Sequence, residues 1–492
     1  MTATDKAGRA QAVGHEHAGP AGAASLDWRP LPVLMVGTFL IVLDFFIVNV
    51  ALPSIQRNLH TSASALEWVI TGYGLAFAVL LITGGRLGDR FGRRRTFSGG
   101  VALFIASSAL CGFAPDAAVL VGARILQGIG AAMISPNVLS LIGVLYAGPP
   151  RVRAITIYGV VMGLGAVCGQ IIGGALIDAN IASGGWRAIF LINLPIGVGA
   201  LVLAPRVVPE SKTQQAARVD LLGVLLCTAG LTALVLPLVE GRQLAWPTWT
   251  WVSLACCPVI IAALAAHQLR LARSGGSPLL HPAVFKERRL RAGLATQMVC
   301  WCSQASFFLV LALYLQDGRG LSPLDSGLVF AILAGAYLLA SLRAPRLTAR
   351  FGRDLILAGT LTVAAGNLAL LWAVSSTTGA HNIAMLAPGL ILVGAGQGFW
   401  ITPLTATVLS FADPERAGMV SGTLSTMQQI GNSLGVAVVG VIFFNTLSRD
   451  GYNNAFENAL VGLAGVLTIA AILTRLMSAP RIPRPAIAAA NE

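Results

Sequence analysis

Long apolar segments recur along the whole chain and are separated by short polar ones. In a helix, about 20 apolar residues are enough to cross a bilayer core roughly 30 Å thick. Each apolar segment must be helical in lipid, because its backbone groups have no water to bond there. The pattern therefore predicts fourteen transmembrane helices, near 31–52, 66–84, 96–114, 118–142, 154–177, 188–205, 220–239, 248–269, 292–315, 325–342, 355–374, 383–411, 418–446 and 459–477.

The basic residues between these segments are distributed unevenly. If the N-terminus is cytosolic, 27 of the 33 Lys and Arg fall in cytosolic segments and five in outer loops, while Arg124 lies inside a span. Cytosolic loops of membrane proteins carry such an excess of positive charge. We therefore expect a multi-pass protein of the cell membrane with both termini in the cytoplasm.

Composition excludes several other classes of protein. Hydrophobic residues make up 55% of the 492 residues and charged residues only 11%, whereas soluble domains carry about a quarter charged residues. The seven cysteines form no CxxC pair, and none of the three lysines belongs to a GxxxxGK phosphate loop. The +13 net charge is explained by topology, so we expect no nucleic-acid partner, metal or cofactor.

An internal repeat divides the chain. RLGDRFGR (Arg86 to Arg93) and RLTARFGR (Arg346 to Arg353) match at six of eight positions, and they follow the second and tenth predicted spans. Duplication of a six-helix unit separates repeats by six spans, so two helices are inserted. We expect a disordered cytosolic tail at 1–30, six-helix bundles at 31–208 and 292–478, two extra helices at 209–270, a cytosolic loop at 271–291 and a cytosolic tail at 479–492.

Five motifs now place the chain in a family. They are LDFFIVNVALP (43–53), GGRLGDRFGRRR (84–95), ARILQGIGAA (123–132), WRAIFLINLPIG (186–197) and SGTLSTMQQIGNSLGVAVVG (421–440). In this order they resemble the fourteen-span drug:proton antiporter family of the major facilitator superfamily. The resemblance implies an all-α membrane protein of the major facilitator fold, with two six-helix bundles and two inserted helices.

The fifth-span motif of that family departs from its usual form. Antiporters of the family place a proline where this chain has Gln170. The glycines around it remain at four-residue steps and permit close approach of another helix. Simple helix packing explains them as well as a hinge does; they are Gly165, Gly169, Gly173 and Gly174.

Two charges are not explained by topology. Asp44 is the only acidic residue deep in a predicted span, and a charge there costs about 2.5 to 3.5 kcal/mol on insertion scales. Helical rise places Asp44 and Arg124 at similar depth. We expect the two to face one aqueous cavity, where protonation of Asp44 releases Arg124 and acts as a proton switch. A static buried ion pair is the alternative.

The loop after the second span is the other candidate machinery. Its arginines can bind carboxylates or lipid phosphates, and Asp89 can cap a helix. The resemblance implies a cytosolic latch that breaks and re-forms as the two halves move. The predicted latch residues are Gly85, Asp89, Arg90, Gly92 and Arg93.

Polar and aromatic residues inside the spans are candidates for a substrate cavity, although each one is more often a helix-packing contact. They are Asn49, Gln127, Trp301, Gln304, Gln397, Trp400, Gln428, Gln429 and Asn432. The expected function is export of drugs, antibiotics or related amphipathic compounds by a monomer, in exchange for protons. The alternative is a dedicated exporter of one metabolite (a siderophore, an amino acid or its own antibiotic), with uniport as an option. An enzyme would need more intramembrane acids or histidines than these spans hold.

Overall fold

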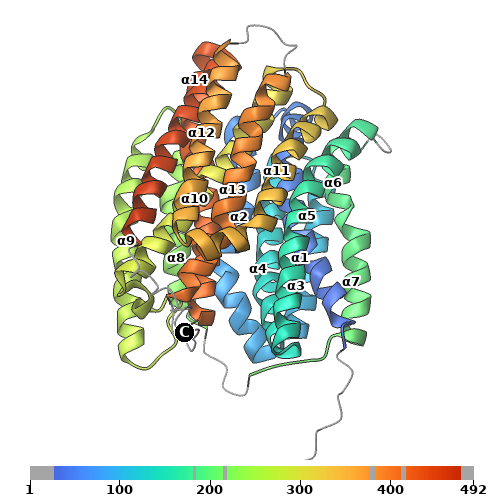
Figure 1. The fold of residues 1–492 in the computed structure, drawn as a ribbon, viewed down its shortest axis with the longest axis vertical. Coiled ribbons are helices and arrows are strands. Elements are labelled where there is room, and N and C mark those ends of the chain that lie inside the picture. Colours follow the sequence, from blue (N-terminus) through green and yellow to red (C-terminus); the bar gives the residue numbers. More distant parts are fainter. Residues whose placement is uncertain (1–26, 181–183, 214–218, 377–382, 412–416, 478–492) are drawn as a thin grey trace, which may run out of the picture.

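A computed structural model describes residues 27–180, 184–213, 219–376, 383–411 and 417–477. The terminal tails expected at 1–30 and 479–492 lie almost wholly outside these ranges. Within them the chain is all-helical (Figure 1). Its α-helices are α1 (Pro30–Leu59), α2 (Ala63–Phe91), α3 (Arg93–Gly112), α4 (Ala117–Leu145), α5 (Pro149–Ala179), α6 (Ala188–Leu191), α7 (Asn193–Val207), α8 (Leu221–Glu240), α9 (Thr248–Arg273), α10 (Arg288–Leu313), α11 (Pro323–Phe351), α12 (Asp354–Ser376), α13 (Ala387–Ser410) and α14 (Ala417–Leu476).

Twelve of the described helices are long and apolar enough to cross a membrane, so the predicted count of fourteen is not confirmed. Helix α3 begins with three arginines and contains several Ser and Gly, which lower its hydropathy. Helix α14 is 60 residues long and is interrupted at Gly451, where φ is 81° and ψ is 179°. Such a positive φ is readily adopted only by glycine.

The loop predicted after the second span is helical for most of its length. Helix α2 continues through Phe91, and α3 begins at Arg93, so only Gly92, with φ of 109°, breaks the helix. The second copy of the repeat likewise lies in α11 up to Phe351 and is broken at Gly352, with φ of 57°. A helix need not end at the membrane surface, because polar residues sustain it beyond the lipid.

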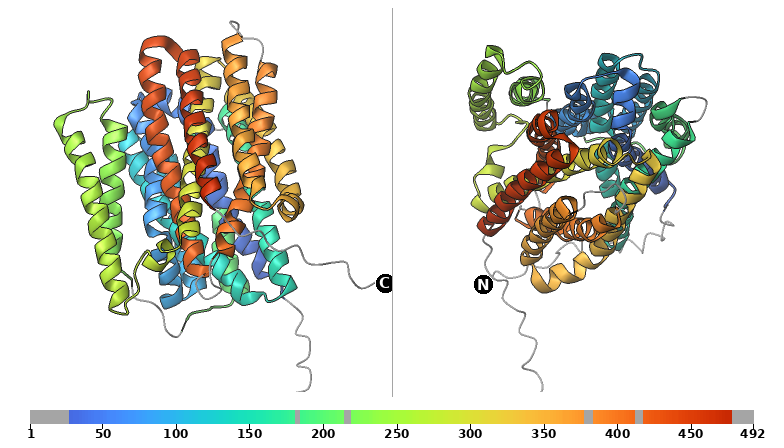
Figure 2. Two further views of the ribbon diagram at one scale, coloured as in Figure 1. Left: turned by 60° about the vertical axis from the view of Figure 1, so that its left-hand side comes forward. Right: turned by 90° about the horizontal axis from the view of Figure 1, so that it is seen from above.

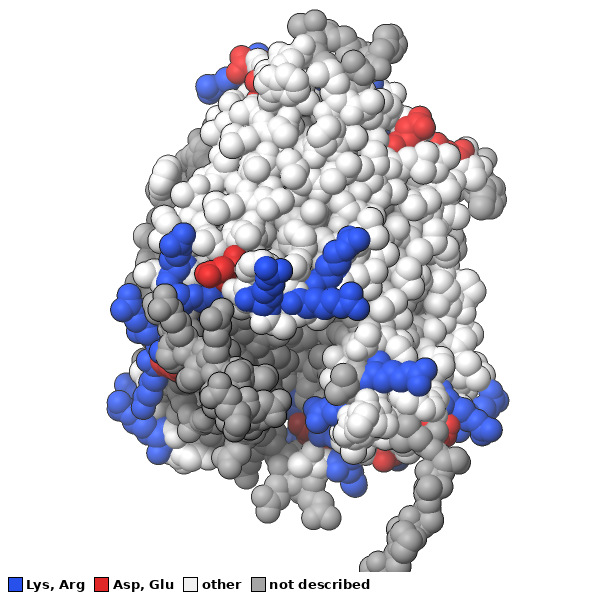
Figure 3. All heavy atoms as spheres, in the orientation of Figure 1, with Lys and Arg blue, Asp and Glu red and all other residues white. Residues whose placement is uncertain are grey.

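Helix packing repeats between the first and last parts of the chain. Helix α1 packs on α5, while α2 and α3 both pack on α4; in the same way α10 packs on α14, while α11 and α12 both pack on α13. We call α1 to α5 the first helix set and α10 to α14 the second helix set. The two sets meet most extensively where α2 contacts α14 and where α5 contacts α11. Most Lys and Arg visible in Figure 3 gather over its lower part, the end at which α1 begins.

Helices α8 and α9 form a hairpin at one side of the molecule (Figure 2). Helix α8 contacts α2 and α14, so the hairpin is attached beside a seam between the two helix sets. Its lower end is tied together by Asp220, which caps α8 through the backbone N–H of Gly223 at 2.8 Å. The same carboxylate lies 2.8 Å from Nε2 of His267 and accepts a hydrogen bond of 2.8 Å from Nε2 of Gln268.

We expect Asp220→Ala to destabilise the protein, because an N-cap contributes about 1 kcal/mol and unpaired buried donors cost about 1 to 3 kcal/mol. Burial raises the pKa of Asp220, but hydrogen bonds from His267, Gln268 and two backbone amides outweigh it and lower the pKa below its ordinary value. The stabilisation is therefore present above the ordinary pKa and is lost as pH falls through the lowered one. Thermal unfolding of the detergent-solubilised protein measures the effect. Asp220→Asn, which keeps the acceptor oxygen, should be intermediate; equal stability of Asp220→Ala and the native protein would contradict the prediction.

Candidate functional site

Asp44 and Arg124 form an ion pair in the first part of the chain. Nη1 of Arg124, on α4, donates to Oδ2 of Asp44, on α1, and the side chains are 1% and 0% exposed. Nε of Arg124 donates to the backbone oxygen of Val69 at 3.0 Å. The guanidinium carbon also lies 4.3 Å from the ring centroid of Tyr73. The two predicted residues are therefore brought together, and the arginine is held from three directions.

Neutral side chains complete the network around the carboxylate. Oδ1 of Asp44 accepts hydrogen bonds from Nε2 of Gln127 at 2.8 Å and from Nδ2 of Asn193 at 3.0 Å. Nη1 of Arg124 donates to Oε1 of Gln127 at 2.7 Å. Asn193 also donates to Ser108 at 3.0 Å. Helices α4 and α7 thus bind the carboxylate of α1 directly, and α3 supports it through Asn193.

Sequence analysis predicted Gln127 for a substrate cavity and did not predict Asn193 or Ser108. Asn193 stands alone among apolar residues in WRAIFLINLPIG, and that interruption is the signal that was available. In the part of the chain that the structure describes, Asp44 and Arg124 are buried and do not face the expected aqueous cavity. Removing one partner of such a buried pair costs about 3 to 5 kcal/mol. A change in the charge of Asp44 must therefore change the surrounding packing.

The predicted fifth-span glycines lie against two different helices. A Cβ atom on Gly169 would approach the backbone oxygen of Leu43 to 3.0 Å, and one on Gly165 would lie 3.1 Å from Val42. Gly173 meets Ile47 in the same way. These glycines let α5 pack closely on the part of α1 that carries Asp44.

Gln170 and Gly174 of α5 contact α11, which belongs to the second helix set. A Cβ atom on Gly174 would lie 2.5 Å from the backbone oxygen of Pro323, and one on Gly327 of α11 would lie 2.6 Å from that of Gln170. The Gln170 side chain is buried, and neither its oxygen nor its nitrogen has a hydrogen-bond partner. Helix α5 therefore connects the Asp44 segment to α11 through backbone contacts.

The predicted latch residues gather at the lower end of α2 and α3. Nη2 of Arg93 donates to Oδ1 of Asp89 at 2.8 Å, so Asp89 binds an arginine and does not cap a helix. The cap of α3 is Glu210, whose carboxylate accepts the backbone N–H groups of Arg94 and Arg95 at 3.1 and 3.2 Å. A Cβ atom on Gly92 would lie 2.6 Å from that carboxylate.

The remaining predicted latch residues, Gly85 and Arg90, have different surroundings. A Cβ atom on Gly85 would lie 3.5 Å from Pro136 of α4. The guanidinium of Arg90 lies 5.3 Å from the ring of its neighbour Phe91. A side chain as small as alanine would therefore fit at Gly85 in ordinary van der Waals contact with α4.

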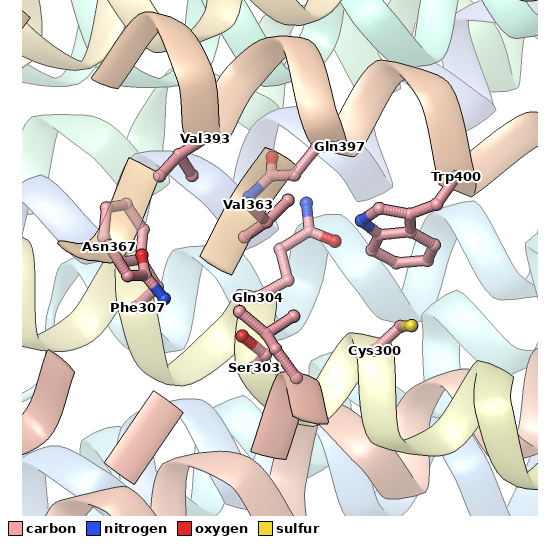
Figure 4. A pocket seen from close by; sticks show the side chains of 10 residues that line it. Cys300, Ser303, Gln304, Phe307, Val363, Asn367, Val393, Gln397 and Trp400 are labelled. Atoms are coloured by element: carbon pink, nitrogen blue, oxygen red, sulfur yellow. The ribbon is translucent and has the colours of Figure 1, made fainter. Parts of the chain in front are cut away.

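Three candidates for the substrate cavity meet in one small pocket inside the second helix set. Gln304 of α10 and Gln397 and Trp400 of α13 line it (Figure 4). Asn367 of α12 also lines it, and neither polar atom of the Asn367 side chain has a hydrogen-bond partner. Trp301 packs edge-on against Trp400, with centroids 5.8 Å apart. The pocket thus presents unpaired amides beside aromatic rings and is lined by no charged residue.

The other cavity candidates lie elsewhere. Asn49 donates to the backbone of its own helix, to Phe45 at 3.1 Å. On α14, Nδ2 of Asn432 donates to Gln429 at 3.0 Å, and Gln428 is half-buried. These four residues are not among those that line the pocket.

A second acid is buried in the structure, although it lies at the start of a predicted span and not deep within it. Glu67 of α2 is 1% exposed. It lies close to the start of the predicted span, where a carboxylate normally reaches water, so nothing in the local pattern distinguished it.

Comparison with known proteins agrees with this architecture. The family model "Major Facilitator Superfamily" matches residues 34–436. The probable actinorhodin transporter of Streptomyces coelicolor is 38% identical over 428 residues, which are 86% of this chain and 73% of that protein. The puromycin resistance protein pur8 of Streptomyces alboniger is 35% identical over 462 residues, covering 91% of this chain and 90% of the relative.

Solved structures share the fold. A bacterial homolog to the human lysosomal transporter Spinster, inward-facing and unoccupied, superposes with a TM-score of 0.66 at 17% identity, covering 93% of this chain and 98% of that one. The curated relatives are antibiotic and multidrug efflux transporters. The chain is a multi-pass membrane protein that belongs to the major facilitator superfamily.

Proposed function

We propose that this protein exports drugs, antibiotics or related small amphipathic compounds in exchange for protons, by alternating access. The observation that carries the proposal is the wholly buried Asp44 carboxylate, bound by Arg124, Gln127 and Asn193. A buried carboxylate with one cationic partner has two states that differ strongly in local electrostatics. Such a group can couple proton binding to a change of packing.

The coupling route runs through α5. While Asp44 is ionised it neutralises Arg124, and the network is closed. A proton on Asp44 leaves Arg124 as an uncompensated buried cation, which favours a conformation that gives the site access to water. The Asp44 segment of α1 packs on the glycines of α5, and α5 packs on α11. A shift at Asp44 therefore reaches the other helix set through tight backbone contacts.

Contacts between the two helix sets at the upper end support a conformation closed on that side. Arg57, on α1, pairs with Asp317, just after α10, at 3.0 Å. Nε2 of Gln316 donates to the backbone oxygen of Val50 at 2.8 Å. Asp178 accepts the backbone N–H of Leu324 at 3.2 Å. We infer that these contacts must break before substrate leaves the cell.

The full topology is part of the proposal. Helix α3 and the two arms of α14 that meet at Gly451 bring the number of crossings from twelve to fourteen. Both termini then lie in the cytoplasm, with six helices on each side of the α8–α9 hairpin, and the protein acts as a monomer. The cluster around Asp89, Arg93 and Glu210 then lies at the cytosolic surface. There it would serve as the latch.

The range of substrates separates two versions of this function. Relatives named for resistance to several drugs favour a broad exporter, while the 38% identity to a probable actinorhodin transporter favours a dedicated one. In either case the amides and aromatic rings that line the pocket offer hydrogen bonds and ring contacts to a substrate only after the pocket widens, because in this conformation it has room for about one water molecule. One charge crossing 100 mV supplies about 2.3 kcal/mol, enough for a roughly fifty-fold gradient.

Proton release from inverted membrane vesicles tests the function. Vesicles carrying the protein are acidified by respiration, and candidate dyes and antibiotics are then added. We expect exported compounds to raise the pH inside the vesicles, because each molecule that enters is exchanged for protons that leave. Vesicles with the Asp44→Asn protein are the control. Transport without any change in pH would contradict antiport and favour a uniporter, and response to a single compound would favour the dedicated exporter.

A further inference from the structure

A second buried carboxylate lies at the upper end of the α2–α14 seam. Glu67 is 1% exposed, and its Oε1 lies 3.9 Å from Nη2 of Arg242, a distance too long for a hydrogen bond. Oε2 of Glu67 has no hydrogen-bond partner, and neither have Nε and Nη2 of Arg242. The Glu67 carboxyl group is therefore buried and incompletely bonded beside a half-buried arginine, an arrangement that is costly when the carboxyl group is ionised.

Arg242 belongs to the turn that joins α8 to α9, and this turn is attached to α2. Nε1 of Trp68 donates to Oε1 of Glu240 at 2.8 Å. The hydroxyl of Ser64 donates to Oε1 of Gln243. Together with the Glu67–Arg242 pair, these contacts place three polar side chains of the four-residue segment 240–243 against the first turns of α2: Glu240, Arg242 and Gln243.

The same turn reaches α14. The guanidinium of Arg242 lies 4.9 Å from the ring centroid of Phe444. A Cβ atom on Gly440 would lie 2.9 Å from the Glu67 carboxyl group, so only glycine at that position leaves room for the buried acid. The turn, α2 and α14 therefore meet at Glu67, and we name the contacts of Glu67, Arg242 and Phe444 the hairpin clasp.

The clasp spans a seam that must open. Helices α2 and α14 form one of the two most extensive contacts between the helix sets. Below the clasp the seam is filled by apolar side chains from α2, α8 and α14, namely Leu75, Val235, Val239 and Ala437. Apolar packing of this kind does not respond to pH. Two carboxyl groups in the described part of this seam can change charge: Glu67, which is buried, and Glu240, which is half-buried.

The Asp44 network touches α2 close to Glu67. The backbone oxygen of Val69, two residues after Glu67, accepts Nε of Arg124. The charged groups that act on the Glu67 carboxylate are Arg242, which attracts it, and Glu240, which repels it. Asp44 has Arg124 as its cation. Each buried acid thus has its own arginine.

We propose that Glu67 is a second proton-binding site, which nothing in the Asp44 mechanism requires, and that its protonation opens the hairpin clasp. This inference rests on the proposed alternating-access function. An ionised Glu67 holds Arg242, and with it the turn, across the seam. A neutral Glu67 removes that attraction, so protons favour parting of α2 and α14 at the upper end. The two helices inserted between the bundles thereby acquire a role as a proton-sensitive closure of the outer side.

Distance measurements on the purified protein test the proposal without requiring transport. Spin labels at His60→Cys and Ser448→Cys, two exposed positions at the upper ends of α1 and α14, report opening in a background with the native cysteines replaced. From about pH 8 to about pH 5, the ratio of long to short distances should rise by up to about tenfold per pH unit around the titration of Glu67. Glu67→Gln should show long distances at every pH.

Matched variants separate charge from structure. Glu240→Gln removes a carboxylate from the same turn and keeps an acceptor for Trp68, so it should retain the pH response. Arg242→Met should be open at every pH, and the double variant with Glu67→Gln should open no further. Arg242→Met also serves if Glu67→Gln fails to fold. A pH response in Glu67→Gln equal to that of the native protein, or no response in the native protein, would overturn the proposal.

The proposed function can fail separately. If Asp44→Asn keeps proton-coupled export, the antiport mechanism is wrong, whereas the distance response to Glu67 does not depend on that assay. If export is coupled but the distances are independent of pH, the clasp is wrong and antiport stands.

Discussion

Replacing Asp44 with asparagine should reduce substrate-driven proton release to the level of vesicles without the protein. Asparagine has nearly the same shape and keeps an oxygen for Gln127 and Asn193, but it cannot bind and release a proton. It also leaves Arg124 unpaired, which costs about 3 to 5 kcal/mol in a buried site. The measurement is proton release on adding a transported compound, at matched amounts of protein in the membrane.

Controls distinguish loss of coupling from loss of fold. Asp116→Asn changes a carboxylate that caps α4 and keeps the capping oxygen, so it should leave proton release unchanged. A single sharp peak on size exclusion must accompany the loss in Asp44→Asn. Proton release by a folded Asp44→Asn protein at the native rate would show that another group carries the proton.

Arg124→Lys should abolish export although the positive charge is retained. A lysine ammonium cannot donate to Val69, Asp44 and Gln127 at once from one planar group, and it loses the stacking over Tyr73. Each hydrogen bond to a charged group is worth about 1.5 to 3 kcal/mol. We therefore expect a lower unfolding temperature together with loss of drug resistance in cells.

The comparison for this variant is Arg95→Lys. The Arg95 side chain is 76% exposed, and its contact with Glu210 is 3.8 Å, so lysine should replace it at little cost. Thermal unfolding and resistance are measured for both variants side by side. Normal resistance in Arg124→Lys would mean that charge alone, and not the directed hydrogen bonds, is what the site needs.

The predicted pairing of Asp44 with Arg124 came from residues that break the apolar pattern. A charge in a span is rare enough to be informative, and helical rise then gives its depth. Asn193 and Ser108 escaped the same reasoning because neutral polar residues are common in spans. Only the packing of α3 and α7 against α1 brings them to the carboxylate.

The burial of Glu67 was not predicted from the sequence for a different reason. Near the end of an apolar segment, a carboxylate ordinarily reaches water, and the sequence contains no sign that a distant turn covers it. The turn between α8 and α9 is more than 170 residues away along the chain. Its position over Glu67 follows from how the hairpin docks on α2 and α14.

The amino-acid sequence by itself determined that this chain spans a membrane, its approximate apolar segments and the asymmetry of its basic loops. These properties depend on segment length and polarity, which are local and can be summed along the chain. The tertiary structure decided which polar groups meet, where helices such as α2 and α14 end or bend, and which acids are sealed from water. Those outcomes depend on the rotation and close approach of helices that are far apart in sequence, set by contacts such as Gly169 on Leu43 and Gly440 beside Glu67.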